Sequence, residues 1–337
     1  MKRIFLVALA LAAVMVSCRN FDIHHDNFIY TSGYFPYQFP VRTLVLGDYI
    51  YDNTNDNNHQ FVISAHIGGV YSNDKDRVFN VEVDNSLCDD VLFSAGGDTV
   101  HAMPAKYYTL SASTITVPKG EMYGGVTVQL TDDFFKDSAA IRNTYVVPLR
   151  LVSSSDVDTI LSGQTDDQNA DPRFSAQWSV PPRNFTMFAV KYINEYHGTY
   201  FHYGKSEVKD GSGAAIEDST YAETYVVNDP VVKLTTTARN QVTATTTFSS
   251  KIFTGDYTML LNFTGDDCQV TAPAGSPYTI SGTGKFQKDA YEWGDEKRDG
   301  IALSVDISDG TNTYHAEDVL VVRDRAVVME TYTPVGY

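Results

Sequence analysis

The segment VVKLTTTARNQVTATTTF, residues 231–248, decides the fold class of this chain. Two runs rich in Val and Thr, residues 231–237 and 241–248, are separated only by Ala238-Arg239-Asn240. Beta-branched residues favour strands, and so short a connection is typical of a hairpin between antiparallel neighbours. The segment therefore predicts a β-hairpin, and the chain on both sides of it continues the pattern.

Further strand-like runs surround this hairpin between residues 188 and 332. They are residues 188–193, 221–227, 257–263, 278–286, 301–307, 319–322 and 326–332. Eight or nine sequential antiparallel strands suit an up-and-down barrel, because closing the sheet removes its exposed edges. We therefore expect residues 187–337 to form an antiparallel β-barrel.

The first half of the chain is also predicted to be β-rich. Short strand-like runs alternate with turns, and one short helix is expected near residues 133–143. This pattern is typical of a β-sandwich, so we expect an Ig-like β-sandwich over residues 28–163. Residues 164–186 are polar and Pro-rich, which indicates a linker. The predicted fold is all-β, with the sandwich first and the barrel second.

The N-terminus has the pattern of a bacterial lipoprotein leader. A positively charged start precedes an apolar run of residues 4–16, shorter than the ~20 residues of a membrane-spanning helix. Cys18 follows a small residue where this run ends. We expect residues 1–17 to be a signal peptide, Cys18 to carry lipid and residues 18–27 to form a tether. The alternative is an ordinary signal peptide in which the cysteine is incidental.

Charge and composition restrict the function. The 337 residues include 25 Lys and Arg against 42 Asp and Glu, a formal charge of −17, which disfavours nucleic-acid binding. No Cys and His spacing typical of a metal site occurs, and no catalytic motif has its supporting elements. We expect no enzymatic activity, no metal and no cofactor, with irregular calcium binding at residues 52–58 left as an alternative to a solvated turn. Cys88 and Cys268 are expected to be separate buried residues.

Several ordered motifs carry a resemblance to a known family. They are residues 40–47 (PVRTLVLG), 68–71 (GGVY), 83–88 (VDNSLC), 103–108 (MPAKYY), 117–120 (VPKG), 130–135 (LTDDFF) and 144–149 (TYVVPL). Together they resemble the N-terminal domain of unknown function of Bacteroidetes outer-membrane lipoproteins from polysaccharide-utilisation loci. The same module is similar to one that precedes the catalytic domain of some chitinase-type endo-N-acetylglucosaminidases. Residues 190–194 (VKYIN) and 196–198 (YHG) resemble the start of a companion C-terminal, lipocalin-like domain.

The resemblance implies a non-catalytic accessory protein that binds a glycan or oligosaccharide. It implies an acyl anchor in the outer membrane, with the cell surface favoured over the periplasmic face, and a TonB-dependent transporter complex as a partner. Since no glycosidase domain follows, the activity of the enzymes is not carried over. Two alternatives stay open: an adhesin-like or structural protein that binds protein partners, and a barrel that encloses a small hydrophobic ligand.

Aromatic residues in loops are the candidates for glycan contact, because apolar sugar faces stack on aromatic rings. The chain has 22 Tyr and 18 Phe but only two Trp, and most of the tyrosines are expected to pack in strands. The candidates that remain are Trp293, Tyr291, Trp178, Tyr34 and Tyr37. For each of them, packing within the protein is the alternative.

Overall fold

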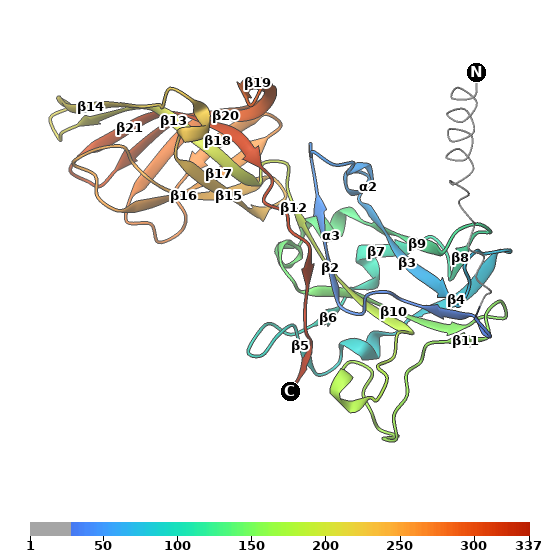
Figure 1. Ribbon diagram of the computed structural model, residues 1–337. Coiled ribbons are helices and arrows are strands. Elements are labelled where there is room, and N and C mark those ends of the chain that lie inside the picture. Colours follow the sequence, from blue (N-terminus) through green and yellow to red (C-terminus); the bar gives the residue numbers. More distant parts are fainter. Residues whose placement is uncertain (1–27) are drawn as a thin grey trace, which may run out of the picture.

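The structure is a computed structural model and describes residues 28–337 (Figure 1). The predicted signal peptide, Cys18 and the whole of the predicted tether lie outside the described residues. About 51% of the chain is strand and 8% helix, and an eight-stranded closed β-barrel follows two curled sheets. The prediction of an all-β chain with a barrel is therefore confirmed.

The N-terminal region is built from two sheets and a few short helices. The first sheet has the order β11 (Thr159–Ile160), β1 (Ser32–Tyr34), β3 (Gln60–Gly68), β9 (Tyr123–Leu130) and β7 (Tyr108–Leu110). The second has the order β22 (Glu330–Thr331), β2 (Pro40–Val45), β12 (Phe185–Ile193), β10 (Tyr145–Ser153), β4 (Arg77–Val83) and β8 (Thr114–Val117), with β6 (His101–Ala102) beside β10. A further pair joins β5 (Val91–Leu92) to β23 (Val335–Gly336). The helical turns are α2 (Thr54–Asn57), η1 (Asn85–Cys88), η2 (Ala105–Tyr107), α3 (Asp132–Lys136), η3 (Ser138–Ile141) and η4 (Ser175–Gln177).

Alternating apolar residues pack the two sheets into a sandwich. In β3, Phe61, Ile63 and Ala65 are buried, while Val62 between them is exposed. They share one hydrophobic core with residues of the second sheet such as Phe79. A strand with this period of two buries one face and leaves the other to solvent.

Strand β12 lies where the sequence did not place it. The sequence predicts residues 188–193 as a strand of the barrel module, but Phe185–Ile193 pairs antiparallel with β10 and parallel with β2. Seven of its nine residues are buried, as a central strand covered on both faces requires. The run gives no period of two, so its pattern alone does not reveal which sheet it joins.

The predicted helix near residues 133–143 is present as two shorter turns. Helix α3 ends at Lys136, and η3 begins after Asp137, whose carboxylate accepts a hydrogen bond from the Ala139 N–H at 2.9 Å. A side chain that caps a new turn competes with continuing the first helix. The single predicted helix is therefore divided at Asp137.

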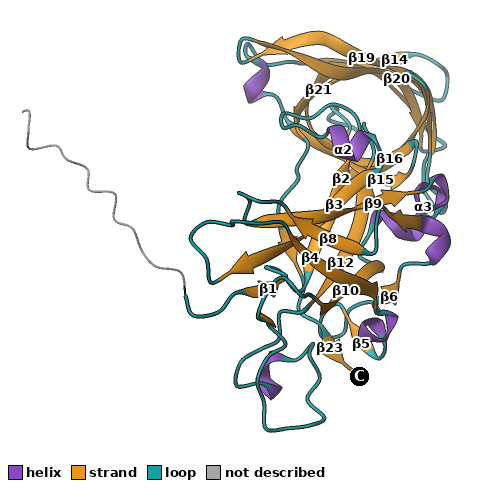
Figure 2. Cartoon of the chain, turned by 90° about the vertical axis from the view of Figure 1, so that its right-hand side faces the viewer, coloured by secondary structure: helices purple, strands orange, loops and turns teal. Residues whose placement is uncertain are grey.

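The barrel is formed by strands that pair with their neighbours in sequence. In order they are β13 (Gly198–Lys209), β15 (Val231–Ala238), β16 (Gln241–Thr247), β17 (Asp256–Thr264), β18 (Asp267–Thr271), β19 (Thr279–Trp293), β20 (Glu296–Ser308) and β21 (Thr313–Asp324). Pairing of β21 with β13 closes the barrel, and β14 (Ala215–Tyr221) extends its wall beside the far half of β13. Helical turn η5 (Val226–Asn228) precedes β15. Figure 2 shows the barrel strands curling round above the N-terminal sheets.

The barrel interior is packed with side chains. Apolar residues from its strands form one buried cluster that includes Tyr200, Leu261 and Val305. Asp318 is also buried, at 2% exposure, with its carboxylate 2.9 Å from the His202 imidazole. An interior filled in this way gives no support to a small hydrophobic ligand inside the barrel.

Arg325 makes several of the hydrogen bonds that join the two regions. Arg325, 6% exposed, follows β21 and donates hydrogen bonds to the carbonyl oxygens of His197, Asp48, Leu46 and Asn194 at 2.6–3.0 Å. Leu46 and Asp48 follow β2 in the sandwich, while His197 begins the barrel. These four hydrogen bonds, which we call the Arg325 clamp, therefore fix the end of the barrel against the end of the sandwich.

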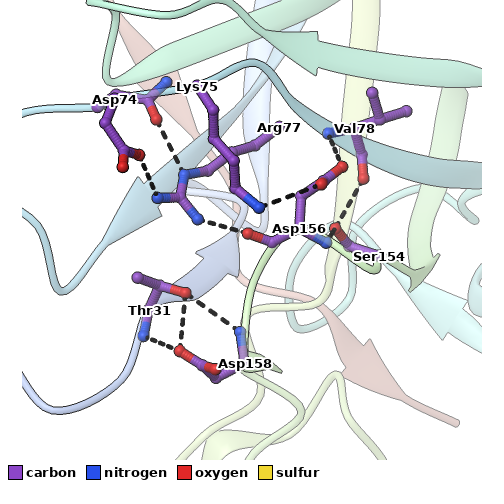
Figure 3. A network of polar contacts seen from close by, with 9 residues as sticks. Thr31, Asp74, Lys75, Arg77, Val78, Ser154, Asp156 and Asp158 are labelled. Carbon is purple, nitrogen blue, oxygen red and sulfur yellow. Dashed lines mark hydrogen bonds and ion pairs between the residues drawn. The ribbon is translucent and has the colours of Figure 1, made fainter.

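A polar network joins the segment after β10 to β4 of the second sheet and to the residue before β1 of the first sheet (Figure 3). Arg77 donates to the carbonyl oxygen of Asp156, and the Asp156 carboxylate accepts the Val78 N–H at 3.0 Å. Thr31 donates its N–H to the Asp158 carboxylate at 2.7 Å, and Asp158 returns its own N–H to the Thr31 hydroxyl at 3.1 Å. These bonds position the chain that continues from Asp158 into the loops described below.

Two further expectations concern single features of the chain. Cys88 and Cys268 are free and buried, as predicted, and burial raises the pKa of each thiol to about 12. Within residues 28–337, no helix is long and apolar enough to cross a membrane.

Candidate functional site

A pocket of about 280 Å³, which we call the Tyr37 pocket, is lined by residues just before β2, at the opposite end of this strand from the Leu46 contact with Arg325. It is bounded by the connection between β1 and β2, by the loop that precedes β12, and by β22. Tyr37, one of the aromatic residues predicted from the sequence, lines it and is 54% exposed. The Tyr37 carbonyl accepts a hydrogen bond from the Thr186 hydroxyl at 2.7 Å, which fixes this part of the loop.

Three further rings line the Tyr37 pocket. Phe39 contacts Phe185 and Tyr332 edge to face, with ring centroids 5.8 and 5.6 Å apart. Tyr332 donates its hydroxyl to the carbonyl oxygen of Met187 at 3.0 Å. Edge-to-face contacts and a satisfied hydroxyl hold these rings in place. The pocket therefore has a fixed aromatic floor beside an accessible tyrosine.

The charge at the pocket wall is neutralised within the protein. Arg173 donates to both carboxylate oxygens of Asp171 at 2.5–3.0 Å and to the carbonyl oxygens of Leu87 and Asp89. Burial would raise the pKa of Asp171, but its hydrogen bonds with Arg173 outweigh this and lower it. Both groups are ionised and paired, so the pocket suits a neutral ligand better than a charged one.

A second groove of about 590 Å³ adjoins the first. It is lined by Tyr30, residues 158–164 and Val180, and it shares Pro181 with the Tyr37 pocket. Trp178 stands in the loop between the two, with its indole N–H donating to the Asp171 carbonyl at 2.8 Å. Trp178 is thus held as part of the loop that separates the two hollows.

Tyr34 lies on the outer face of the first sheet, away from the Tyr37 pocket. Its ring centroid is 5.9 Å from that of His66, and His66 is 5.4 Å from Tyr123. The three residues sit opposite one another on β1, β3 and β9. They form a cross-strand row of rings whose outermost member, Tyr123, is exposed.

Trp293 and Tyr291 lie on the barrel wall, close to the hairpin between β19 and β20. The Trp293 indole N–H donates to the carbonyl oxygen of Val322 at 2.9 Å, and its ring contacts Phe201 and the Arg298 guanidinium. Tyr291 packs over Gly300, where an added Cβ would meet its ring at 2.5 Å. These contacts explain the packing of both rings, and their predicted role in glycan binding stays a prediction.

The structure therefore distributes the five predicted aromatic residues over three places. Tyr37 and Trp178 share one end of the sandwich, Tyr34 lies on a sheet face, and Trp293 and Tyr291 lie on the barrel. Sequence reasoning missed Phe39, Phe185 and Tyr332. No local pattern could bring Tyr332 to the pocket, because it lies after the barrel and only the returning C-terminal segment places it there.

The acidic turn at residues 52–58 forms helix α2 and its flanks. The Asp56 side chain is buried and pairs with Arg42, while Asp52 accepts the Thr54 N–H at 3.0 Å. These hydrogen bonds account for the two carboxylates as parts of a helical turn. In the part of the chain that is described, no group of three or more His, Cys, Asp or Glu side chains is arranged to hold a metal ion.

Comparisons with known proteins place both halves of the chain. A family model of an N-terminal domain matches residues 27–158, and the domain of unknown function DUF5627 matches residues 195–326. The chain is 34% identical to a structural-genomics protein of unknown function from Bacteroides ovatus, with a TM-score of 0.85. This match covers 93% of the present chain and 100% of that one.

More distant structures are also similar in part. An auxiliary nutrient binding protein from Bacteroides thetaiotaomicron is 13% identical, with a TM-score of 0.36 over 84% of this chain and 90% of that one. A multidomain protein from Bacteroides ovatus that includes DUF1735 is 12% identical, with a TM-score of 0.40 over 87% and 94%. Such TM-scores are too low to indicate a function. No curated protein matches the chain.

Proposed function

This chain belongs to the family of the Bacteroides ovatus protein of unknown function, and we propose that it is a non-catalytic, glycan-binding lipoprotein of the outer membrane. The observation that carries the proposal is the Tyr37 pocket. An accessible tyrosine stands beside the half-buried Phe39, which the buried Phe185 and Tyr332 hold in place, and accessible aromatic rings are what the apolar face of a sugar stacks on.

The polar rim of the pocket completes the match to a neutral sugar. Gln38, Ser175 and Thr331 line it with amide and hydroxyl groups, which can donate to or accept from sugar hydroxyls. The paired Arg173 adds no net attraction for an acidic group. With a volume of about 280 Å³, at the lower end of small-molecule sites, the pocket suits a single terminal sugar residue better than a long chain.

The membrane anchor belongs to the same proposal. Cys18 carries the lipid and becomes the first residue once residues 1–17 are removed, and the acyl chains hold the protein on the outer membrane, on the cell-surface side. A TonB-dependent transporter complex is the proposed partner. The leader pattern and the resemblance to lipoproteins of polysaccharide-utilisation loci support this. A Cys18→Ser variant should leave the membrane fraction and lose incorporation of labelled palmitate; retention of both would contradict lipidation.

Titration calorimetry against a panel of neutral oligosaccharides tests the binding function. We expect at least one glycan to bind, and Tyr37→Ala to weaken it about tenfold, since one stacking contact contributes about 1 kcal/mol. Tyr225→Ala is the matched control, because Tyr225 is 69% exposed and lies outside the pocket. Absence of binding to every glycan, or equal losses in both variants, would contradict the proposal.

A further inference from the structure

A cleft lies between the sandwich and the barrel, on the surface where the β15–β16 turn meets helical turn η3. It has a volume of about 420 Å³, and a smaller pocket of about 230 Å³ adjoins it. Arg239 and Asn240, both in the β15–β16 turn, line the two hollows together. We call this place the Arg239 cleft; it is separate from the Tyr37 pocket and shares no lining residue with it.

Arg239 has no anionic partner among residues 28–337. Its Nη2 lies 3.2 Å from Nε2 of His59, its guanidinium lies 4.9 Å from the centre of the Phe135 ring, and its buried Nη1 has no hydrogen-bond partner. Burial and the charge of Arg239 lower the pKa of His59, so the imidazole is neutral and accepts from the arginine. Among the described residues, no carboxylate therefore forms a direct ion pair with Arg239, although Asp137 and Glu195 line the same cleft.

This situation differs from that of the other well-buried arginines. Arg77 and Arg173 are each paired with a carboxylate, and Arg325 donates to four carbonyl oxygens. A buried guanidinium nitrogen without a partner costs free energy. Because Nη1 of Arg239 is buried, an acceptor in the open volume of the cleft would recover this free energy once the guanidinium turns Nη1 toward it.

Donors, rings and carboxylates surround Arg239. Ser138, Asn240, Lys136 and the buried Phe263 line the larger hollow, and Glu195 lines the smaller one. Lys136 is exposed and forms an ion pair with Asp133 at 3.5 Å. Asp137 also lines the larger hollow, but its carboxylate already accepts hydrogen bonds from the hydroxyls of two tyrosines and from a backbone N–H. Donors beside aromatic rings suit a ligand that carries both an oxyanion and apolar C–H groups.

The walls of the cleft are fixed before any ligand binds. The buried Asn194 amide donates to the carbonyl oxygens of Ala238 and Gln241 at 3.0 and 2.9 Å, which holds the base of the turn that carries Arg239. The Arg325 clamp holds the same junction from the other side. Preorganised clefts at domain interfaces bind ligands without a large ordering cost.

We propose that the Arg239 cleft binds the oxyanion group, a carboxylate or a sulfate, of an acidic sugar, with Arg239 as its anchor. The ring of the sugar lies against Phe135 and Phe263, and the Asn240 amide and Ser138 hydroxyl bond to its oxygens. Arg239 and Lys136 are the cationic residues that line the two hollows, and the carboxylates of Asp137 and Glu195 line them too, so the attraction for an oxyanion comes from direct contact with Arg239. The site does not depend on glycan binding at the Tyr37 pocket.

Calorimetry with glucuronate, glucose 6-sulfate and glucose tests the proposal on the full chain. We expect one or both acidic sugars to bind, more weakly at high salt, and glucose to show no binding that depends on Arg239. Comparing the two acidic sugars distinguishes carboxylate from sulfate as the preferred group. Arg239→Gln should weaken acidic-sugar binding at least tenfold, since it removes a charge-assisted hydrogen bond.

Two further variants distinguish the loss of a ligand contact from a general loss of folding. Arg183→Gln removes an arginine from the groove beside the Tyr37 pocket and should leave acidic-sugar binding unchanged. Asn240→Asp adds a negative charge at an exposed turn position and should also weaken binding without unfolding the barrel. Equal affinity for glucuronate and glucose, or unchanged acidic-sugar binding in both cleft variants, would overturn the proposal. Such a result would not bear on glycan binding at the Tyr37 pocket.

Discussion

The barrel and the sandwich both have a buried core between strands, but their strands are connected in different ways. In the barrel, nearly every strand pairs with the next one in sequence, and a single long-range pairing, β13 with β21, closes the ring. In the sandwich, β2 pairs in parallel with β12, about 150 residues further along the chain, and β1 pairs with β11. Long connections are the consequence of this second arrangement, because parallel strands cannot be joined by tight turns.

The difference determines where open surface is found. The barrel encloses its apolar residues in one packed cluster. The sandwich leaves the long segment between β11 and β12 on its outside, and this segment forms walls of both the Tyr37 pocket and the groove beside it. Loops held by a rigid scaffold are the usual place for recognition. We therefore assign the barrel a supporting role and place the proposed neutral-glycan site on the sandwich.

Removing the clamp between the two regions should have the largest effect. Arg325→Met leaves three buried carbonyl oxygens and one partly buried one without their donor, which we expect to cost about 3–5 kcal/mol. The two regions should then unfold in separate steps in a calorimetric scan, where the natural chain unfolds in one. A single transition with an unchanged midpoint would show that the clamp does not couple them.

The second prediction concerns the pH dependence of the same junction. Burial and the nearby Arg325 lower the pKa of His197 from 6.5 to about 4, so the folded protein keeps this imidazole neutral. As the pH falls below 6.5, His197 binds a proton in the unfolded chain but not in the folded one. The free energy of unfolding therefore declines until the pH reaches about 4. Between about pH 7 and about pH 4.5 this amounts to about 2–3 kcal/mol.

Urea unfolding of a His197→Gln variant isolates this contribution from that of the acidic residues. The glutamine amide can still accept the Thr236 N–H that now bonds to the imidazole. The variant should lose about 2–3 kcal/mol less than the natural chain over the same pH interval. Parallel pH profiles for the two proteins would argue against a neutral buried histidine at the junction.

Alanine substitutions at two glycines compare how tightly a sandwich loop and a barrel turn are packed. Gly163 and Gly213 have φ values of +85° and +84°, so alanine costs about 1 kcal/mol at either through backbone strain. At Gly163 an added Cβ would also meet Trp178 and Pro182 at 2.8 Å, whereas nothing lies within 4 Å at Gly213. Gly163→Ala should therefore destabilise by about 2–3 kcal/mol.

Thermal unfolding together with tryptophan fluorescence measures this difference. Gly163→Ala should shift the Trp178 emission, since the ring must move, and Gly213→Ala should not. Equal stability losses with no change in emission would mean that the loop before β12 is not packed as described.

The sequence predicted the local strand pairing of the barrel better than the long-range pairing of the sandwich. The hairpin around Ala238-Arg239-Asn240 was predictable, because its pairing is local and its strands alternate. Strand β12 was assigned to the wrong region, because a run buried on both faces carries no sign of its partners. Tyr37 could be singled out as an aromatic residue in a loop, but Tyr332 could not be placed beside it, because that contact depends on a C-terminal segment returning past the barrel. The Arg239 cleft is formed between two regions and has no local signature.

A crystal structure of the protein with the tightest-binding neutral oligosaccharide of the panel would test the central claim most directly. The account predicts a sugar ring stacked on Tyr37, with its hydroxyls bonded to the rim of the pocket. A sugar bound only on the barrel wall, at Trp293, or inside the barrel would contradict it.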